Sequence, residues 1–245
     1  MSVTHSSPST RAFGRFELRQ LLGKSAGTMS WLAFDPAGGH EVMLTMPRVQ
    51  PAAPAALDHW QHSVRLAARL NHPNLAEVAE FGVQDHWPFV AVDRVHGVTL
   101  KEWIAGHAPT APEDAVRWTT ELLAGLAFAH EAGIAHLDLQ LHSLLIDERG
   151  TVRVMALAAA GDAAAVLRAG APVRSSGQTI DTDALRAQRA AAARDVLAAG
   201  LLLQQLLTGQ APLDEPDTAL AMGRLPPLGR ELVRLPWSTP LPITA

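Results

Sequence analysis

The sequence has no cysteine among its 245 residues. The chain therefore cannot form disulfides, attack a substrate with a thiolate, or bind zinc or an iron–sulfur cluster through cysteine. It also has no run of basic residues, and its formal net charge is −4 at pH 7. A surface that follows a phosphate backbone needs clustered Lys and Arg, so we expect no nucleic-acid partner.

Long apolar runs are missing as well. The stretch VLAAGLLL (196–203) stops at Gln204, short of the ~20 apolar residues that cross a bilayer. The first 16 residues hold no apolar core of the length found in signal peptides. With 48% hydrophobic and 18% charged residues, the composition is typical of a globular chain with a substantial core. We expect a cytoplasmic protein with no membrane partner.

The first half of the chain predicts a small antiparallel sheet with one helix. Short strand patterns separated by turns run from Phe16 to about Val49, and two more follow in LAEVAEFGV and PFVAVDRV. Between them, apolar residues recur at spacings of three and four, the period of a helix with one buried face. These residues are Leu57, Trp60, Val64, Ala67 and Leu70. The prediction is a five-stranded sheet with one helix.

The second half predicts mainly helices. The stretch APEDAVRWTTELLAGLAFAHEAG (111–133) opens with Pro112 and acidic residues and ends at Gly133, the usual punctuation of a helix. Two short strands, SLLIDE and TVRVMAL, follow with a tight turn between them. Residues 158–183 lack periodicity and predict a loose segment. A further helix is predicted at about 184–208, closed by Gly209.

Several strings, in this order, resemble a bacterial Ser/Thr protein kinase. FELRQLLGKSAGTMSWLAFD resembles its glycine-rich hairpin, EVMLTMPR the strand with the phosphate-binding lysine, RLNHPNLAEV the junction after the regulatory helix, and FVAVDRVHGVTLKEWI the hinge. HLDLQLHSLLIDERGTVRVMALA resembles the catalytic loop and metal-binding strand, and RDVLAAGLLLQQLLTGQAP the central helix. The resemblance spans roughly residues 13–215.

The resemblance implies an α+β fold with two lobes. We expect a flexible tail at 1–12, an N-terminal lobe at 13–93, a shortened helical C-terminal lobe at 94–235, and a Pro-rich tail or linker at 236–245. The segment between Ala156 and Asp195 is shorter than the family usually has, and the last helices of the family have no counterpart. Either the large lobe is reduced or the chain is the front part of a longer protein.

Against this family, the phosphate-binding positions have changed. Phosphoryl transfer asks the protein mainly for positioning and for neutralisation of charge. Gly23 remains in the loop that should approach the phosphates, but the next two loop glycines correspond to Ser25 and Thr28. The lysine corresponds to Thr45, and its acidic partner on the helix corresponds to Ser63.

The metal-binding positions have changed too. Magnesium prefers carboxylate and amide oxygens in octahedral geometry. The resemblance places the metal-binding Asn at Ser143 and the Asp–Phe–Gly triplet at Ala156-Leu157-Ala158. Since alanine carries no ligand atom, magnesium is not expected.

Two positions that border the adenine ring in the family carry side chains of a different size here. The small alanine beside the ring corresponds to Met43, and the valine that covers the ring corresponds to Ser30. Methionine adapts its shape and fills gaps, so we expect Met43 to occupy part of the adenine space. The hinge residue Asp93 and the pocket floor residue Leu145 complete the altered nucleotide pocket. ATP is expected to bind weakly at best.

Asp138 survives where the family has its catalytic base. It could orient a substrate hydroxyl, or it could simply hold the loop by accepting backbone hydrogen bonds; we favour the second interpretation. Three structural positions of the family also carry suitable residues. His136 and Leu157 match the spine of packed side chains that joins the lobes, and Asp195 should hydrogen-bond the catalytic-loop backbone.

Histidines offer a competing metal site. His59 and His62 have helical ligand spacing, and His130, His136 and His142 are six residues apart. No carboxylate completes either set, so we expect hydrogen-bonded or exposed histidines and no metal.

The sequence therefore predicts a pseudokinase and no enzyme, serving as a regulatory or scaffolding module with a protein partner or an attached output domain. Two alternatives remain: a Ser/Thr kinase with residual, unconventional ATP-dependent transfer through Asp138, or a pseudokinase that senses another small ligand.

Overall fold

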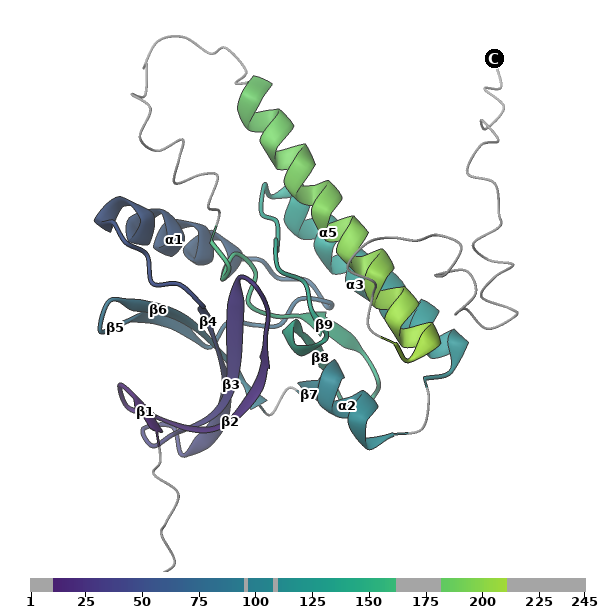
Figure 1. Cartoon of the computed structure of the whole chain (residues 1–245), viewed down its shortest axis with the longest axis horizontal. Helices are drawn as coiled ribbons and strands as arrows, with labels where there is room; N and C mark the ends of the chain where they lie inside the picture. The colour runs from purple at the N-terminus through teal and green to yellow at the C-terminus, as the bar shows by residue number, and fades with distance from the viewer. Residues whose placement is uncertain (1–10, 95–96, 108–109, 162–181, 211–245) are drawn as a thin grey trace, which may run out of the picture.

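The structure is a computed structural model that describes residues 11–94, 97–107, 110–161 and 182–210 (Figure 1). It has an N-terminal lobe, made of a curled sheet and one helix, and a mainly helical C-terminal lobe. They are called the upper and the lower lobe below; in the view of Figure 1 they lie at the left and at the right. The predicted α+β, two-lobed fold is confirmed. Most of the predicted loose segment (162–181) and the predicted Pro-rich tail lie outside the described residues.

The upper sheet has six antiparallel strands in the order β1-β2-β3-β4-β6-β5. They are β1 (Arg11–Phe13), β2 (Phe16–Lys24), β3 (Thr28–Asp35), β4 (His40–Pro47), β5 (Glu80–Gln84) and β6 (Trp87–Asp93).

The predicted count of five strands is wrong because β1 falls partly in the predicted tail. Gly14 has a φ of 56°, which a glycine adopts without strain, and the turn returns the chain onto β2. The Phe13 ring then meets Phe89 edge to face at 5.6 Å between centroids.

Helix α1 (Pro54–Ala67) packs by one face, as its apolar spacing predicts. It begins with proline, whose missing N–H costs nothing in the first turn. Trp60, Val64 and Ala67 are buried. The Trp60 indole N–H donates to the Ala159 carbonyl oxygen at 3.0 Å, so α1 is tied to the segment that follows β9 (Val152–Val154).

The lower lobe is built on two long helices, α3 (Pro112–Glu131) and α5 (Thr182–Thr208), which lie side by side in Figure 1. A short helix, α2 (Leu100–Gly106), begins with a reciprocal cap between Thr99 and Glu102. A three-stranded sheet holds β7 (Val98–Thr99), β8 (Leu144–Ile146) and β9; β7 has too few residues to give a sequence pattern. The 3-10 turn η2 (Leu141–Ser143) leads into β8.

Part of α5 is long and apolar enough to cross a membrane. By length and composition alone, Leu185–Thr208 qualifies, contrary to the expectation that no stretch would. In this structure the helix packs on α3 and contributes Ala199, Leu202 and Leu206 to the core of the lower lobe. A core helix meets the same test, so the finding is weak evidence for a span.

Candidate functional site

The catalytic-loop region is fixed by one buried carboxylate. Asp195 of α5 is 1% exposed. It accepts hydrogen bonds from the backbone N–H of His136 at 2.7 Å and of Leu137 at 2.8 Å. The His130 ring adds a third contact at 2.8 Å. Leu137 has a φ of 68°, a strained value for a leucine, and its bonded N–H helps to hold it there.

His136 positions the backbone of the next functional residue. Its Nδ1 accepts from the Asp138 N–H at 3.3 Å, and its Nε2 donates to the Met155 carbonyl oxygen at 3.1 Å. Burial lowers the pKa of His136, so the ring is neutral in the tautomer that these two bonds require. Asp138 therefore sits on a loop that is fixed from both the helical and the strand side.

The Asp138 carboxylate faces the upper lobe. It is 9% exposed. Its Oδ2 accepts hydrogen bonds from the Ser25 hydroxyl and, at 2.6 Å, from the Thr28 hydroxyl. Ser25 lies in the loop between β2 and β3 and Thr28 is the first residue of β3, both more than 100 residues earlier in the chain. The two positions that lack the expected glycine are therefore the two that bond the retained aspartate.

Ser25 also organises its own loop. Its Oγ accepts from the backbone N–H groups of Gly27 at 3.1 Å and Thr28 at 2.9 Å. Arg48 donates to the Ser25 carbonyl oxygen at 2.8 Å. The loop is thus a tight, hydrogen-bonded turn that lies against the lower lobe.

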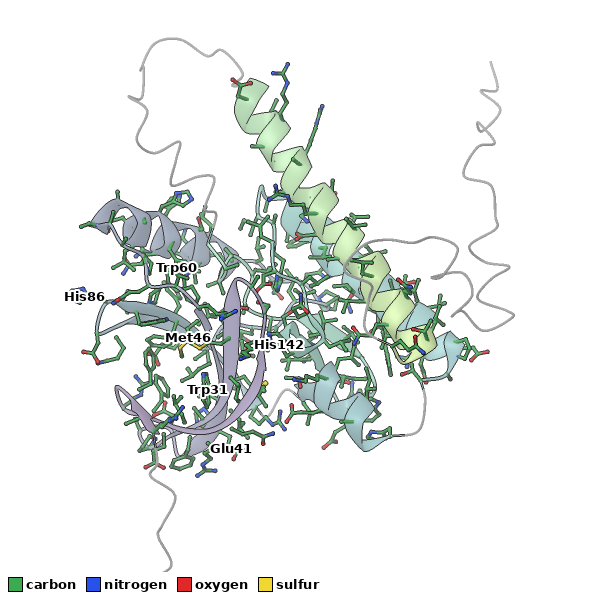
Figure 2. All side chains as sticks on the ribbon, viewed as in Figure 1. Trp31, Glu41, Met46, Trp60, His86 and His142 are labelled. Atoms are coloured by element: carbon green, nitrogen blue, oxygen red, sulfur yellow. The ribbon has the colours of Figure 1, made fainter. Side chains whose placement is uncertain are left out.

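Two further contacts hold β2 down beside this loop. Lys101 of α2 donates to the Leu22 carbonyl oxygen at 3.0 Å. The His142 ring lies so close to Gly23 that a side chain at position 23 would overlap it, and Figure 2 places His142 beside the β2–β3 hairpin. His142 is 4% exposed, and its Nε2 has no hydrogen-bond partner among the described residues. Burial lowers the pKa of His142 to about 4; Asp138 opposes this effect and Lys101 adds to it.

Four other upper-lobe positions belong to the predicted nucleotide pocket: Ser30, Thr45, Asp93 and Ser63. Ser30 and Thr45 face each other across β3 and β4 with 2.8 Å between their hydroxyl oxygens, and both are buried. Asp93, at the end of β6, bonds the His40 ring at 3.0 Å. Ser63 of α1 lines a cavity of about 830 Å³ together with Trp60 of the same helix, Leu137 of the catalytic loop and residues of α5.

Met43 lies where the two lobes meet. It has no exposed surface and belongs to a cluster that also contains Val90 and Val92 of the upper sheet and Leu145 and Met155 of the lower lobe. Ala156 joins the same cluster, and Leu157 packs in the lower-lobe core. The apolar floor and the spine positions are therefore filled by packed side chains.

The residues at the metal positions do not fit magnesium. The Ser143 hydroxyl accepts from the Gln140 N–H at 2.9 Å and donates to the Gln140 carbonyl oxygen at 2.8 Å. Ala156 has no ligand atom. Within the described ranges, no group of three His, Cys, Asp or Glu could hold a metal ion. His130 and His136, two of the candidate ligands, are bonded instead to Asp195 and the Met155 carbonyl.

Comparison with known families identifies this arrangement. The model of the protein kinase domain matches residues 48–225, well over half of the chain. The chain belongs to the protein kinase family. The match begins at Arg48, so the β2–β3 loop and Thr45 precede it.

Curated relatives are bacterial kinases. Serine/threonine-protein kinase PrkC of Bacillus subtilis (strain 168) is 27% identical over 88% of this chain and 34% of its own length. A probable serine/threonine-protein kinase PknB of Lactococcus lactis is 31% identical over 68% of this chain and 27% of its own. The chain spans about a third of the length of these relatives.

A solved structure shares the fold. The crystal structure of Rad53 1–466 in complex with AMP-PNP superposes with a TM-score of 0.57 and 17% identity, covering 92% of this chain and 58% of that one.

The prediction that the chain is no enzyme is wrong. Relatives named Ser/Thr-protein kinases, at 27–31% identity over most of the chain, point to a kinase enzyme. The prediction rested on what Thr45, Ser143 and Ala156 cannot do. It left out Lys101 and His142, which reach β2 beside the glycine-rich loop only through the tertiary fold.

Sequence reasoning also underrated Ser25 and Thr28. It counted them only as two replaced glycines, whereas in the structure they are hydrogen-bond donors to Asp138. The available signal was their chemistry: both replacements carry a hydroxyl, and the one acidic residue retained in the catalytic loop is an acceptor.

Asp195→Ala should destabilise the protein. It leaves the buried N–H groups of His136 and Leu137 without an acceptor, at a cost of about 3 kcal/mol in the free energy of unfolding. Urea denaturation measures the loss. Asp58→Ala, at an exposed position of α1, is the matched control and should change stability little. Equal stability of both variants would contradict the assigned role of Asp195.

His142 should make stability depend on pH. Its folded pKa of about 4 lies below the usual value of 6.5, so its contribution is complete above pH 6.5 and is lost as pH falls toward 4. The loss is on the order of 3 kcal/mol. Urea denaturation between pH 7 and pH 4 should show a shallower pH dependence for His142→Gln than for the original chain. Identical slopes would show that the ring is not buried as described.

Proposed function

We propose that this chain is a Ser/Thr protein kinase module with slow, unconventional ATP-dependent phosphotransfer, acting in bacterial signalling, with Asp138 as the proton acceptor. The curated relatives support the reaction class. The geometry of Asp138 supports the assignment of the residue.

One observation carries the proposal: the Asp138 carboxylate already receives hydrogen bonds from hydroxyl groups. A general base must lie within hydrogen-bond reach of the proton that it removes. Asp138 meets this condition on a loop fixed by Asp195 and His136. A hydroxyl of a Ser or Thr acceptor would take the place that loop hydroxyls hold in this structure.

The transfer balances as follows. The acceptor oxygen forms a bond to the γ-phosphorus of ATP, while the bond from that phosphorus to the β–γ bridging oxygen breaks and ADP leaves with the electron pair. The hydroxyl proton passes to the Asp138 carboxylate. The products are a phosphorylated Ser or Thr, ADP and a proton that Asp138 later releases.

Positive charge is proposed to come from side chains outside the family pattern. Thr45 carries none, but Arg48 and Lys101 both donate to backbone carbonyls of the loop region, at Ser25 and Leu22. When the loop lifts, both cations become free for phosphate oxygens. With no fitting ligands at Ser143 and Ala156, we propose weak ATP binding and transfer that depends little on magnesium.

The acceptor and the setting follow from the same proposal. The acceptor is a protein hydroxyl, on a separate partner or on a domain attached to this module, and the module acts in the cytoplasm. A matched length of about a third of the relatives leaves room for attached domains in proteins of this kind.

Asp138→Asn should abolish the transfer. The amide can still accept a hydrogen bond but cannot take the proton, so labelling from γ-³²P-ATP should fall by ~10²-fold or more. Asp58→Asn, on the exposed face of α1, is the control. Incubation with a mixed protein acceptor and phosphoamino-acid analysis measure the outcome.

Two results would contradict the proposal. Labelling by Asp138→Asn at the original rate would remove Asp138 from the chemistry. Complete loss of labelling when EDTA removes magnesium would contradict the proposed independence of the metal.

Lys101→Ala and Arg48→Ala should each weaken ATP binding. Loss of one phosphate-contacting cation should raise KM for ATP by ~10-fold and change kcat less. Arg149→Ala, at an exposed turn after β8, is the control with an equal change of charge. An unchanged KM in both variants would show that these cations do not meet the nucleotide.

A further inference from the structure

We propose that Ser25 and Thr28 form an internal latch that competes with the acceptor hydroxyl for Asp138. The latch regulates the site assigned above, so it rests on the proposed function. In the latched state the hydroxyls of Ser25 and Thr28 occupy Oδ2 of the carboxylate, and an outside hydroxyl can bond this oxygen only after the loop lifts.

The contact is saturated at one oxygen atom. Oδ2 of Asp138 accepts from the Ser25 and Thr28 hydroxyls together, which uses the acceptor capacity that a carboxylate oxygen offers in its plane. A Cβ atom at Gly27 would come within 3.1 Å of the same oxygen. The two loop hydroxyls therefore take the hydrogen-bonding positions of Oδ2, and an outside hydroxyl can bond this oxygen only by displacing one of them.

The latch has the chemistry of a bound acceptor. Ser25 and Thr28 are the two residue types that a Ser/Thr kinase phosphorylates, and each presents its hydroxyl to the proposed base. Glycine at either position could lie equally close but could not donate a hydrogen bond. The replacement of two glycines by hydroxyl residues thus creates a contact between the lobes that glycines cannot make.

Neighbouring contacts make the latch cooperative. Ser25 is itself held by two backbone N–H groups of its own loop, and Arg48 holds its carbonyl. Near the end of β2, Lys101 donates to the Leu22 carbonyl oxygen and the His142 ring packs against Gly23. Opening the loop breaks these contacts together, so the open and closed forms are discrete states rather than a continuum.

The decisive variant is Ser25→Ala with Thr28→Val, which removes both hydroxyls and nearly preserves their shape. Amide hydrogen exchange of residues 23–30 should become at least ~10-fold faster, because hydrogen bonds to a charged group are lost. KM for the protein acceptor should fall by a similar factor while kcat changes less, which is the signature of a removed competitor. Thr120→Val, on the exposed face of α3, is the matched loss of a hydroxyl.

A second variant guards against a folding artefact. Ser25→Gly with Thr28→Gly removes the same hydroxyls with the residue type that the loop normally has in this family. It should show the same faster exchange and lower KM, and its thermal unfolding midpoint checks that the variant is folded at the assay temperature.

The results distinguish a failure of the latch from a failure of the proposed kinase function. Unchanged exchange in both double variants overturns the latch, whatever the activity. Faster exchange with equal labelling by the variants and the original chain overturns the competition alone. No labelling by any protein overturns the proposed function and this regulation together, while the exchange rates still report whether the hydroxyls hold the loop.

Discussion

The structure depends most on the buried carboxylate of Asp195. It comes from α5, more than 50 residues after the loop that it holds, and accepts the N–H groups of His136 and Leu137. A buried N–H without an acceptor costs ~1–3 kcal/mol, so this one side chain fixes the path of the loop against the central helix. His136 then passes that order on to Asp138 through its ring and to β9 through the Met155 carbonyl. The direction in which Asp138 points is set before any substrate is present.

The second constraint is the closure of the β2–β3 loop on the lower lobe. Hydroxyls meet Asp138, Lys101 meets a strand carbonyl, and the His142 ring lies under Gly23 in contact that only glycine allows. These ties come from two segments of the lower lobe, α2 and the catalytic loop. They explain how a pocket that lacks its usual lysine can still bring the lobes together: hydrogen bonds and packing replace the attraction between a cation and a bound phosphate.

The side chains missing from the family's usual positions do not by themselves decide whether the chain is an enzyme. Thr45 carries no charge, the Ser143 hydroxyl is bonded to the Gln140 backbone, and Ala156 has no ligand atom. Phosphate charge can still be neutralised by cationic side chains from other parts of the folded chain. Arg48 and Lys101 are near the loop for reasons of tertiary structure, and relatives named as kinases match most of the chain.

The sequence by itself determined the fold class and the local elements. The three-to-four spacing around Trp60 and Val64 predicts α1, because this period follows from the burial of one face. Short strand patterns separated by turns predict the sheet. Short strands such as β1 and β7 were not predicted, because two or three residues are too few to show a period. Only the tertiary structure decided that Ser25 and Thr28 meet Asp138, more than 100 residues away. Contacts between hydrogen-bonding groups leave no repeat in a sequence; they exist only when the fold closes.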